Sequence, residues 1–206
     1  SKRVKPQMVL KVGEKLSVEI LEKIDDKWKI KLNYTGNIYE ILGEYGNIPL
    51  PPYIERNMTD EQYKNLDFER YQTVYAKYEG SVAAPTAGLH FTKEILDKLE
   101  QKGVGKAFVH LNVGLGTFKP VKVDNIENHK MDSETFEIPE DSANAINEAI
   151  AQGKNIVAVG TTSVRTLETT MQKYGKIIPV KDHSELFIYP GFEFKIVNKI
   201  ITNFHL

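Results

Sequence analysis

Hydrophobic and polar side chains alternate with a period of two near the start of the chain. The hydrophobic positions are Leu16, Val18, Ile20, Trp28, Ile30 and Leu32. Period two is typical of half-buried strands, and the acidic pair at 25–26 between the two runs favours a turn, so we expect a hairpin. Residues 9–12 extend the pattern, and residues 33–37 form a second turn region. Together they predict a small antiparallel sheet or barrel, which is too short to be stable by itself.

Beyond residue 45, helical and extended patterns alternate. Thr92 is a typical N-cap, Ile95 and Leu99 continue an apolar stripe at helical spacing, and Gly103 follows as a stop signal. These positions predict a helix from Thr92 onward. Residues 106–113 then alternate as in a strand. Because side chains in a strand point to opposite faces in turn, one face is expected to carry the polar positions and the other the aliphatic ones.

The second half of the chain repeats this alternation. Residues 133–138 are extended in pattern, and residues 139–151 predict a helix with Pro139 in its first turn and Gly153 after its end. Residues 155–159 predict a buried strand that leads into another helix. The apolar face of that helix consists of Val164, Leu167 and Met171.

Residues 48–53 are rich in proline, which forbids a helix and favours an extended linker. The linker separates an antiparallel part, residues 1–47, from residues 48–206, in which helices and strands alternate. The fold class expected is therefore α/β, with mixed α and β elements. Residues 60–78 are polar and aromatic, and the periodicity over 70–75 does not decide between a strand and a helix.

Composition limits the classes of protein that fit. A chain of 206 residues with 41% hydrophobic content can bury one good core, or one core and a small satellite domain. No apolar stretch resembles a membrane span or a signal peptide, so a cytoplasmic protein is expected. The absence of cysteine removes disulfides and thiolate chemistry. The net charge of −1 argues against a large nonspecific nucleic-acid surface. Residues 1–40 carry nine Lys and Arg against six Asp and Glu, an excess that is more often a solvated face.

Residues 81–92 hold a histidine among small, flexible residues directly ahead of a helix start. Pro85 fixes its own φ, and Gly88 permits backbone conformations that a side chain would block. His90 is therefore expected in a rigidly held loop beside a helix N-terminus, where anions and polar ligands are favoured. The alternative is an ordinary loop histidine. Four of the five histidines lie in clusters of this kind, among glycines or polar residues.

Residues 159–168 are the best anion-binding candidate in the chain. A strand leads through Gly160 into a helix, where backbone N–H groups and hydroxyls converge at the positive end. The hydroxyls belong to Thr161, Thr162 and Ser163. In the alternative interpretation these hydroxyls are only helix caps, and Arg165 pairs with Glu168 three residues later on the same helix surface.

His110 is a polar residue on an otherwise strand-like face, near a glycine-rich end where ligands tend to bind in α/β sheets. As an alternative it bridges backbone groups. Several familiar sites are excluded or weak. The chain has no phosphate loop, Gly114 and Gly116 lack the third glycine of a dinucleotide motif, and Ser163 lacks the glycine-flanked turn of a hydrolase nucleophile. No pair of histidines has the spacing of a zinc site.

Eight short motifs follow one another along the chain. They are 49–54 (PLPPYI), 70–76 (RYQTVYA), 84–92 (APTAGLHFT), 110–120 (HLNVGLGTFKP), 129–134 (HKMDSE), 159–168 (VGTTSVRTLE), 186–191 (LFIYPG) and 201–205 (ITNFH). In this order they resemble the S-adenosylmethionine:tRNA ribosyltransferase-isomerase family of queuosine biosynthesis. The resemblance is dense over 48–206 and loose before it. It implies a small antiparallel β-barrel domain, to which residues 1–47 contribute, and a larger α/β domain. Relative to the family, both domains are expected to be incomplete.

The resemblance implies a tRNA substrate that carries 7-aminomethyl-7-deazaguanine at the wobble position. The ribosyl part of S-adenosylmethionine would be transferred to the aminomethyl group and isomerised, which gives epoxyqueuosine and releases adenine and methionine. S-adenosylmethionine is then a substrate, so no cofactor and no metal are expected, and the protein is expected to be a monomer. In the family mechanism a base removes a proton beside the sulfonium, adenine leaves as the ribose opens, and the amine captures the electrophile before the epoxide closes.

This mechanism suggests roles for residues in the motifs. We expect His90 or His110 to act as general acid or base, and Asp132 and Glu134 to face the sulfonium or the aminomethyl ammonium. The expected catalytic residues are His90, His110, Glu134 and Arg165. The expected substrate-binding residues are Thr86, Gly88, Gly114, Gly116, His129, Asp132, Thr161, Thr162, Ser163, Glu168, Asn203 and His205.

Two other functions are alternatives to this one. A noncatalytic RNA- or anion-binding module would use the basic hairpins, with Trp28 and Tyr34 as a stacking surface, although Trp28 suits a core position better. A methyltransferase is disfavoured because the chain lacks an early glycine-rich turn after a strand with an acidic residue beyond it.

Overall fold

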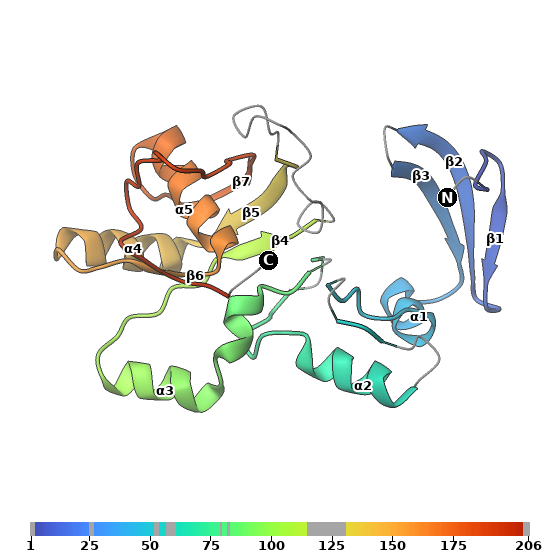
Figure 1. Cartoon of the computed structure of the whole chain (residues 1–206), viewed down its shortest axis with the longest axis horizontal. Coiled ribbons are helices and arrows are strands. Elements are labelled where there is room, and N and C mark those ends of the chain that lie inside the picture. The colour runs from blue at the N-terminus through green and yellow to red at the C-terminus, as the bar shows by residue number, and fades with distance from the viewer. Residues whose placement is uncertain are drawn as a thin grey trace. The chain divides into compact units, whose positions relative to one another are not determined.

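The computed structural model describes residues 3–24, 27–51, 54–56, 61–78, 80–81, 83–114 and 131–203. The chain divides into two compact units, Ser1–Ile48 and Pro49–Leu206. Figure 1 shows their elements.

The first unit is an antiparallel sheet of β1 (Val9–Val12), β2 (Leu16–Ile24) and β3 (Lys27–Tyr34), in the order β1-β2-β3. The predicted hairpin is confirmed, because Leu16 pairs with Tyr34 and Ile20 with Ile30 in antiparallel register. Leu16 and Ile20 are buried. Within the described residues the three strands form an open sheet and not a closed barrel.

The turn region expected at 33–37 is shorter in the structure, because β3 continues to Tyr34 and a helix follows. This helix, α1 (Ile38–Tyr45), begins after Asn37, whose side chain accepts a hydrogen bond from the backbone N–H of Tyr39. Ile41 is its buried residue. The turn-like composition of residues 33–37 gave no signal for α1.

The second unit begins with helices. Residues 60–78, which the sequence left open, contain α2 (Glu61–Arg70), and the following residues 71–78 form neither helix nor strand. The 3₁₀ helix η1 (Thr86–His90) contains His90, and α3 (Lys93–Gln101) follows it. The predicted cap is confirmed, because the Thr92 hydroxyl accepts a hydrogen bond from the N–H of Ile95 at 3.3 Å.

Two small sheets and two helices complete the second unit (Figure 1). Strands β4 (His110–Asn112), β5 (Glu134–Ile138) and β7 (Val180–Ser184) form an antiparallel sheet in the order β4-β5-β7. Strands β6 (Val157–Val159) and β8 (Lys199–Ile201) form a parallel pair. The helices are α4 (Glu140–Ala151) and α5 (Thr161–Tyr174). Both helices and the extended segment at 133–138 are as the sequence predicts.

The core of the second unit lies between α4, α5 and strands β5 and β6. Its buried residues are Phe136, Ile138, Ala143, Ile146, Ala158, Val164, Leu167, Ile177, Ile196 and Val197. The apolar face predicted for α5 is confirmed, because Met171 packs against the same cluster. The strand expected at 155–159 is shorter and less buried than predicted: β6 starts at Val157, which is 47% exposed.

Candidate functional site

The parallel strands β6 and β8 end side by side, where α5 begins. The N–H of Gly160 donates to the carbonyl of Ile201 at 2.8 Å, which joins the helix start to the end of β8. Gly160 has a φ of +87°, a conformation that L side chains rarely adopt. The first N–H groups of a helix have no partner within the helix, so this end favours an anion. Thr161 is exposed, and Thr162 and Ser163 are half-buried.

The structure brings His90 and Asn203 together at this place. His90 Nε2 lies 2.8 Å from Asn203 Oδ1, although the residues are 113 positions apart. An amide oxygen can only accept, so in this arrangement Nε2 carries the proton. The Nδ1 of a neutral His90 then holds the lone pair and can accept a proton. Asn203 follows β8 by two residues, so β8 and η1 together define the position of the imidazole.

Close packing at Gly88 holds η1, the element that carries His90. A Cβ atom at Gly88 would meet the Tyr75 hydroxyl first and the Thr73 methyl group at 2.7 Å. Burial raises the pKa of Tyr75 above its ordinary value of 10.0. The tyrosine ring also packs against Phe108, with 5.5 Å between the ring centroids. The glycine is therefore needed for the approach of residues 73–75, which the sequence did not identify.

Ser81 attaches the start of the histidine motif to β4. Its hydroxyl donates to the carbonyl of Leu111 at 2.8 Å and accepts from the N–H of Val113 at 3.0 Å. A Cβ atom at Gly80 would lie 3.1 Å from the side-chain oxygen of Asn112. Residues 80–81 therefore run beside the end of β4, which brings the segment before the motif at 84–92 next to residues 111–113.

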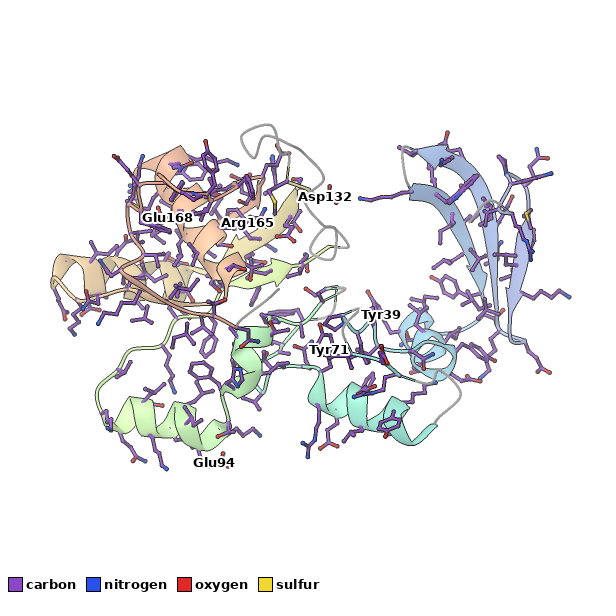
Figure 2. All side chains as sticks on the ribbon, in the orientation of Figure 1. Tyr39, Tyr71, Glu94, Asp132, Arg165 and Glu168 are labelled. Atoms are coloured by element: carbon purple, nitrogen blue, oxygen red, sulfur yellow. The ribbon has the colours of Figure 1, made fainter. Side chains whose placement is uncertain are left out.

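Arg165 and Glu134 form a buried ion pair between α5 and β5, with side chains 10% and 9% exposed. The guanidinium also donates from Nε to the carbonyl of Leu186 at 2.8 Å and from a terminal nitrogen to the carbonyl of Ser184 at 3.2 Å. Arg165 therefore does not pair with Glu168, as one interpretation of the sequence proposed. Figure 2 labels both residues on α5, together with Asp132 near the start of β5.

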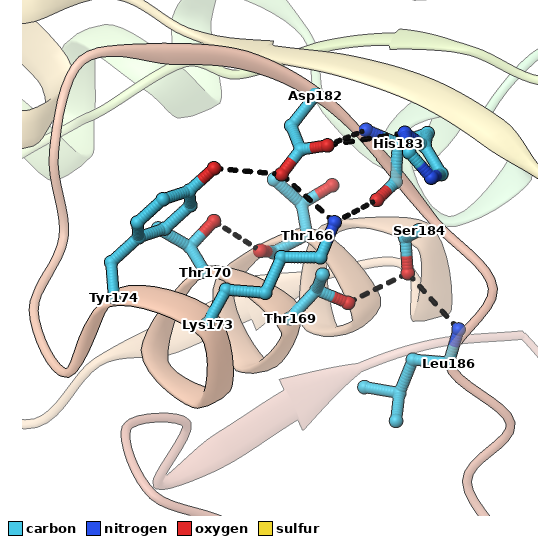
Figure 3. A network of polar contacts seen from close by, with 9 residues as sticks. All are labelled: Thr166, Thr169, Thr170, Lys173, Tyr174, Asp182, His183, Ser184 and Leu186. Atoms are coloured by element: carbon cyan, nitrogen blue, oxygen red, sulfur yellow. Dashed lines mark hydrogen bonds and ion pairs between the residues drawn. The ribbon is translucent and has the colours of Figure 1, made fainter.

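The ion pair begins a row of polar contacts along α5. Further along the helix, the Thr169 hydroxyl bonds that of Ser184 at 2.7 Å, and Lys173 Nζ donates to Asp182 at 2.8 Å (Figure 3). Hydrogen bonds from Lys173, from the His183 N–H and from the Tyr174 hydroxyl lower the pKa of Asp182 to about 2. Because Arg165, Thr169 and Lys173 are four residues apart, they form one stripe on the helix. This stripe fixes α5 to the sheet.

Glu168 lies on another side of α5 and is fully buried, at 0% exposure. Its carboxylate accepts hydrogen bonds from the backbone N–H groups of Lys195, Ile196 and Val197. The contacts observed are with the protein's own backbone, and the direct substrate contact that we expected for Glu168 stays a prediction.

His110 lies in a groove on the face of the β4-β5-β7 sheet that α5 does not cover. The groove has a volume of about 720 Å³, and its lining includes Tyr78, Asn112, Thr135, Glu137, Lys181 and His183. The Tyr78 ring meets the imidazole edge-on at 4.4 Å, and Nδ1 lies 3.7 Å from a Glu137 oxygen. A hydrogen bond from Lys181, aided by the charges of Lys181 and His110, lowers the pKa of Glu137. The strand predicted over residues 106–113 is shorter in the structure, because β4 covers His110–Asn112, where Leu111 packs against the core as the alternation predicts.

Some of the remaining predicted site residues lie in the described part of the chain, and others do not. Thr86 is half-buried in η1, Gly114 follows β4, and Asp132 is half-buried just before β5. Gly116, His129 and His205 lie outside the described residues. Sequence reasoning missed Ser184, the common partner of two α5 side chains, since no local pattern distinguishes it.

The described residues lack two kinds of feature. No group of three or more His, Cys, Asp or Glu side chains is arranged to hold a metal ion. No helix in the described part of the chain combines the length and the apolar character that a membrane crossing needs.

Comparison with known proteins gives a consistent result over the whole chain. An S-adenosylmethionine:tRNA ribosyltransferase-isomerase of Clostridioides difficile is 49% identical over an alignment of 211 residues, which covers 98% of this chain and 60% of the relative. The protein of that name in Finegoldia magna is 48% identical over 207 residues, covering 100% of this chain and 58% of the relative. The chain thus spans about three fifths of the length of these curated relatives.

Among solved structures, a crystal structure of S-adenosylmethionine tRNA ribosyltransferase from Thermotoga maritima is 31% identical and covers 100% of this chain and 52% of that chain. Its TM-score of 0.44 does not by itself establish a common fold. The model of the family described as queuosine biosynthesis protein matches residues 1–206. The chain therefore belongs to the queuosine biosynthesis protein family.

Proposed function

We propose that this protein transfers the ribosyl part of S-adenosylmethionine to a tRNA and isomerises it, in the biosynthesis of queuosine. The observation that carries the proposal is the match of 98% of the chain, at 49% identity, to a relative named for this reaction. The acceptor is the aminomethyl group of 7-aminomethyl-7-deazaguanine at the tRNA wobble position. The products are epoxyqueuosine in the tRNA, adenine and methionine. S-adenosylmethionine is consumed as a substrate.

We place the chemistry beside His90, where β8 ends and α5 begins. The positive sulfonium acidifies the adjacent C–H, and His90 Nδ1 takes that proton while its Nε2–H stays bonded to Asn203. Loss of adenine and opening of the ribose follow, and the amine of the modified base attacks before the epoxide closes. The hydrogen bond on its other nitrogen fixes the orientation of the imidazole and supports His90 as the base.

The start of α5 is proposed to bind a carboxylate or phosphate group. Its first N–H groups and the hydroxyls of Thr161, Thr162 and Ser163 suit the methionine carboxylate of S-adenosylmethionine, or a tRNA phosphate. Glu134 on β5 and Arg165 near the beginning of α5 form a buried ion pair. We assign to them the task of holding α5 on β5, so that the N–H groups at the helix start keep their direction. Asp132, two residues before Glu134, is the proposed partner of the substrate's positive charge.

The groove at His110 holds a second candidate for acid or base catalysis. His110 Nδ1 lies 3.7 Å from a Glu137 oxygen there. The departing adenine needs a proton, and a histidine beside a carboxylate is a group that can supply it. We therefore propose His90 as the base and leave His110 as the candidate acid. In the whole protein, β1 to β3 are proposed to belong to a small β-barrel domain, and the protein is proposed to act as a monomer.

The test uses the full-length protein, S-adenosylmethionine and tRNA with or without the wobble aminomethyl base. Chromatography measures adenine, methionine and S-adenosylhomocysteine. Joint release of adenine and methionine that depends on the modified tRNA supports ribosyl transfer. Release of S-adenosylhomocysteine indicates a methyltransferase, and tRNA binding without any product indicates the noncatalytic RNA-binding module.

A further inference from the structure

Glu168 binds a segment that is remote from it in the sequence. Its Oε2 accepts a hydrogen bond from the N–H of Lys195 at 2.9 Å, and its Oε1 accepts from Ile196 at 3.1 Å and Val197 at 3.0 Å. Three successive N–H groups thus converge on one carboxylate, an arrangement that favours an anion. Bonds to an ionised acceptor are stronger than neutral ones, so Glu168 is a firm anchor for this segment.

The anchored segment leads directly into β8. Ile196 and Val197 are buried in the core, and Asn198 then pairs with Ile156. The Asn198 N–H donates to the Ile156 carbonyl at 3.0 Å, and the Asn198 side chain accepts from the Ile156 N–H at 2.7 Å. From there β8 runs parallel to β6, and Asn203 follows two residues after its end.

We propose that Glu168 is a positioning residue that fixes the register of β8 and thereby holds Asn203 against His90. Side chains of a strand alternate between two faces, so a slip of one residue in β8 reverses the direction of those that follow. The hydrogen bonds of Glu168 to residues 195–197 oppose such a slip before the start of β8. The hydrogen bond between Gly160 and Ile201 opposes it at the end of β8. The consequence for catalysis rests on the proposed function, whereas the coupling to His90 stands on the contacts alone.

The variant Glu168→Gln tests the anchor with little change in volume. Both carboxylate oxygens accept hydrogen bonds, so an amide must direct its NH₂ group at one or more of the N–H donors. Thr170→Val is the matched control, because Thr170 is also 0% exposed on α5. Its hydroxyl donates to the carbonyl of Thr166 within the helix and not to residues 195–197. Both variants lose buried hydrogen bonds, but only the first loosens the anchor.

The direct readout is the imidazole of His90, followed by nitrogen-15 NMR of the histidine-labelled 206-residue chain, with His90→Gln to assign its signal. We expect Glu168→Gln and Asn203→Ala to move the His90 Nε2 resonance in the same direction, and Thr170→Val to leave it at its wild-type position. If Glu168→Gln lowers the unfolding midpoint but leaves the His90 resonance unchanged, Glu168 has a structural role only and the proposal is overturned.

Kinetics of the full-length protein supply a second readout. Because small misplacements in an active site are costly, Glu168→Gln is expected to lower kcat about tenfold or more with little change in KM. The double variant Glu168→Gln/Asn203→Ala should turn over no more slowly than Asn203→Ala alone, since both changes remove one interaction. Losses that multiply contradict the proposal. A wild-type protein without ribosyl transfer contradicts the proposed function, and the NMR comparison then decides the positioning role by itself.

Discussion

The buried pair of Arg165 and Glu134 allows a quantitative prediction of stability. Arg165→Leu removes the cation from a buried carboxylate and also the donor from two backbone carbonyls, at Leu186 and Ser184. Breaking a buried ion pair from one side costs about 3–5 kcal/mol, so we expect Arg165→Leu to lie at the upper end of that range. Glu134→Leu leaves the guanidinium with its two carbonyl acceptors, so its cost should lie at the lower end.

The double variant tests whether the two side chains act as a pair. Replacement of both partners by apolar residues avoids an isolated buried charge, so the double variant is expected to lose at least about 1 kcal/mol less than the sum of the single losses. Urea unfolding of the chain, followed by circular dichroism at 222 nm, measures each free energy of unfolding. Lys173→Leu is the control on the same stripe of α5. Its side chain is 39% exposed, so removal of its ion pair should cost about 1 kcal/mol or less.

Two results would refute this reasoning about the pair. One is a loss of less than about 1 kcal/mol for Arg165→Leu, the magnitude of an exposed ion pair. The other is strict additivity of the two single variants, which would show that they do not interact in the folded chain.

Three further variants test other contacts. Gly88→Ala should destabilise the chain by about 1–3 kcal/mol, because its Cβ would meet the Tyr75 hydroxyl. Adding Tyr75→Phe to this variant should restore part of the loss. Equal stability of Gly88→Ala and wild type in urea unfolding contradicts the close packing. Thr92→Ala should cost about 1 kcal/mol through loss of the α3 N-cap, measured in the same way, and no change would mean that the cap contributes nothing. The pKa of Asp182 is lowered to about 2, so its ionised form stabilises the fold above about pH 4, and this contribution is lost as the pH falls toward 2. Thermal midpoints of Asp182→Asn should accordingly fall less steeply than those of wild type between pH 4 and 2, and parallel curves would contradict the shift.

The elements with local signals were predictable from the sequence. The hairpin of β2 and β3 follows from strict alternation, and the start of α3 follows from the capping hydroxyl of Thr92. Helix α1 was missed because its cap, Asn37, lies in a stretch that has the composition of a turn, and because Gly43 interrupts its short sequence. A helix can thus be predicted from the sequence where caps and periodicity agree, and it is missed where they conflict.

The partners of the site residues could not be predicted, because they come from distant parts of the chain. Arg165 and Glu168 are three positions apart, which favours a local pair, yet each binds a different remote segment. The same is true of His90, whose partner Asn203 is brought to it by the pairing of β8 with β6. Sequence motifs supplied candidate residues, whereas the strand pairing that brings His90 and Asn203 together is a tertiary property.

The most direct test of this account is the turnover of full-length His90→Gln beside that of His110→Gln. Glutamine at position 90 retains a side chain that can bond Asn203 but cannot take a proton, so the account predicts a fall in kcat of about 100-fold or more, the usual contribution of a general base. His110→Gln is the companion histidine variant, and its kcat tests the candidate acid for the leaving adenine. Turnover of His90→Gln within about threefold of wild type, well below the contribution of a general base, would contradict the assignment of the reaction to the junction of β8 and α5.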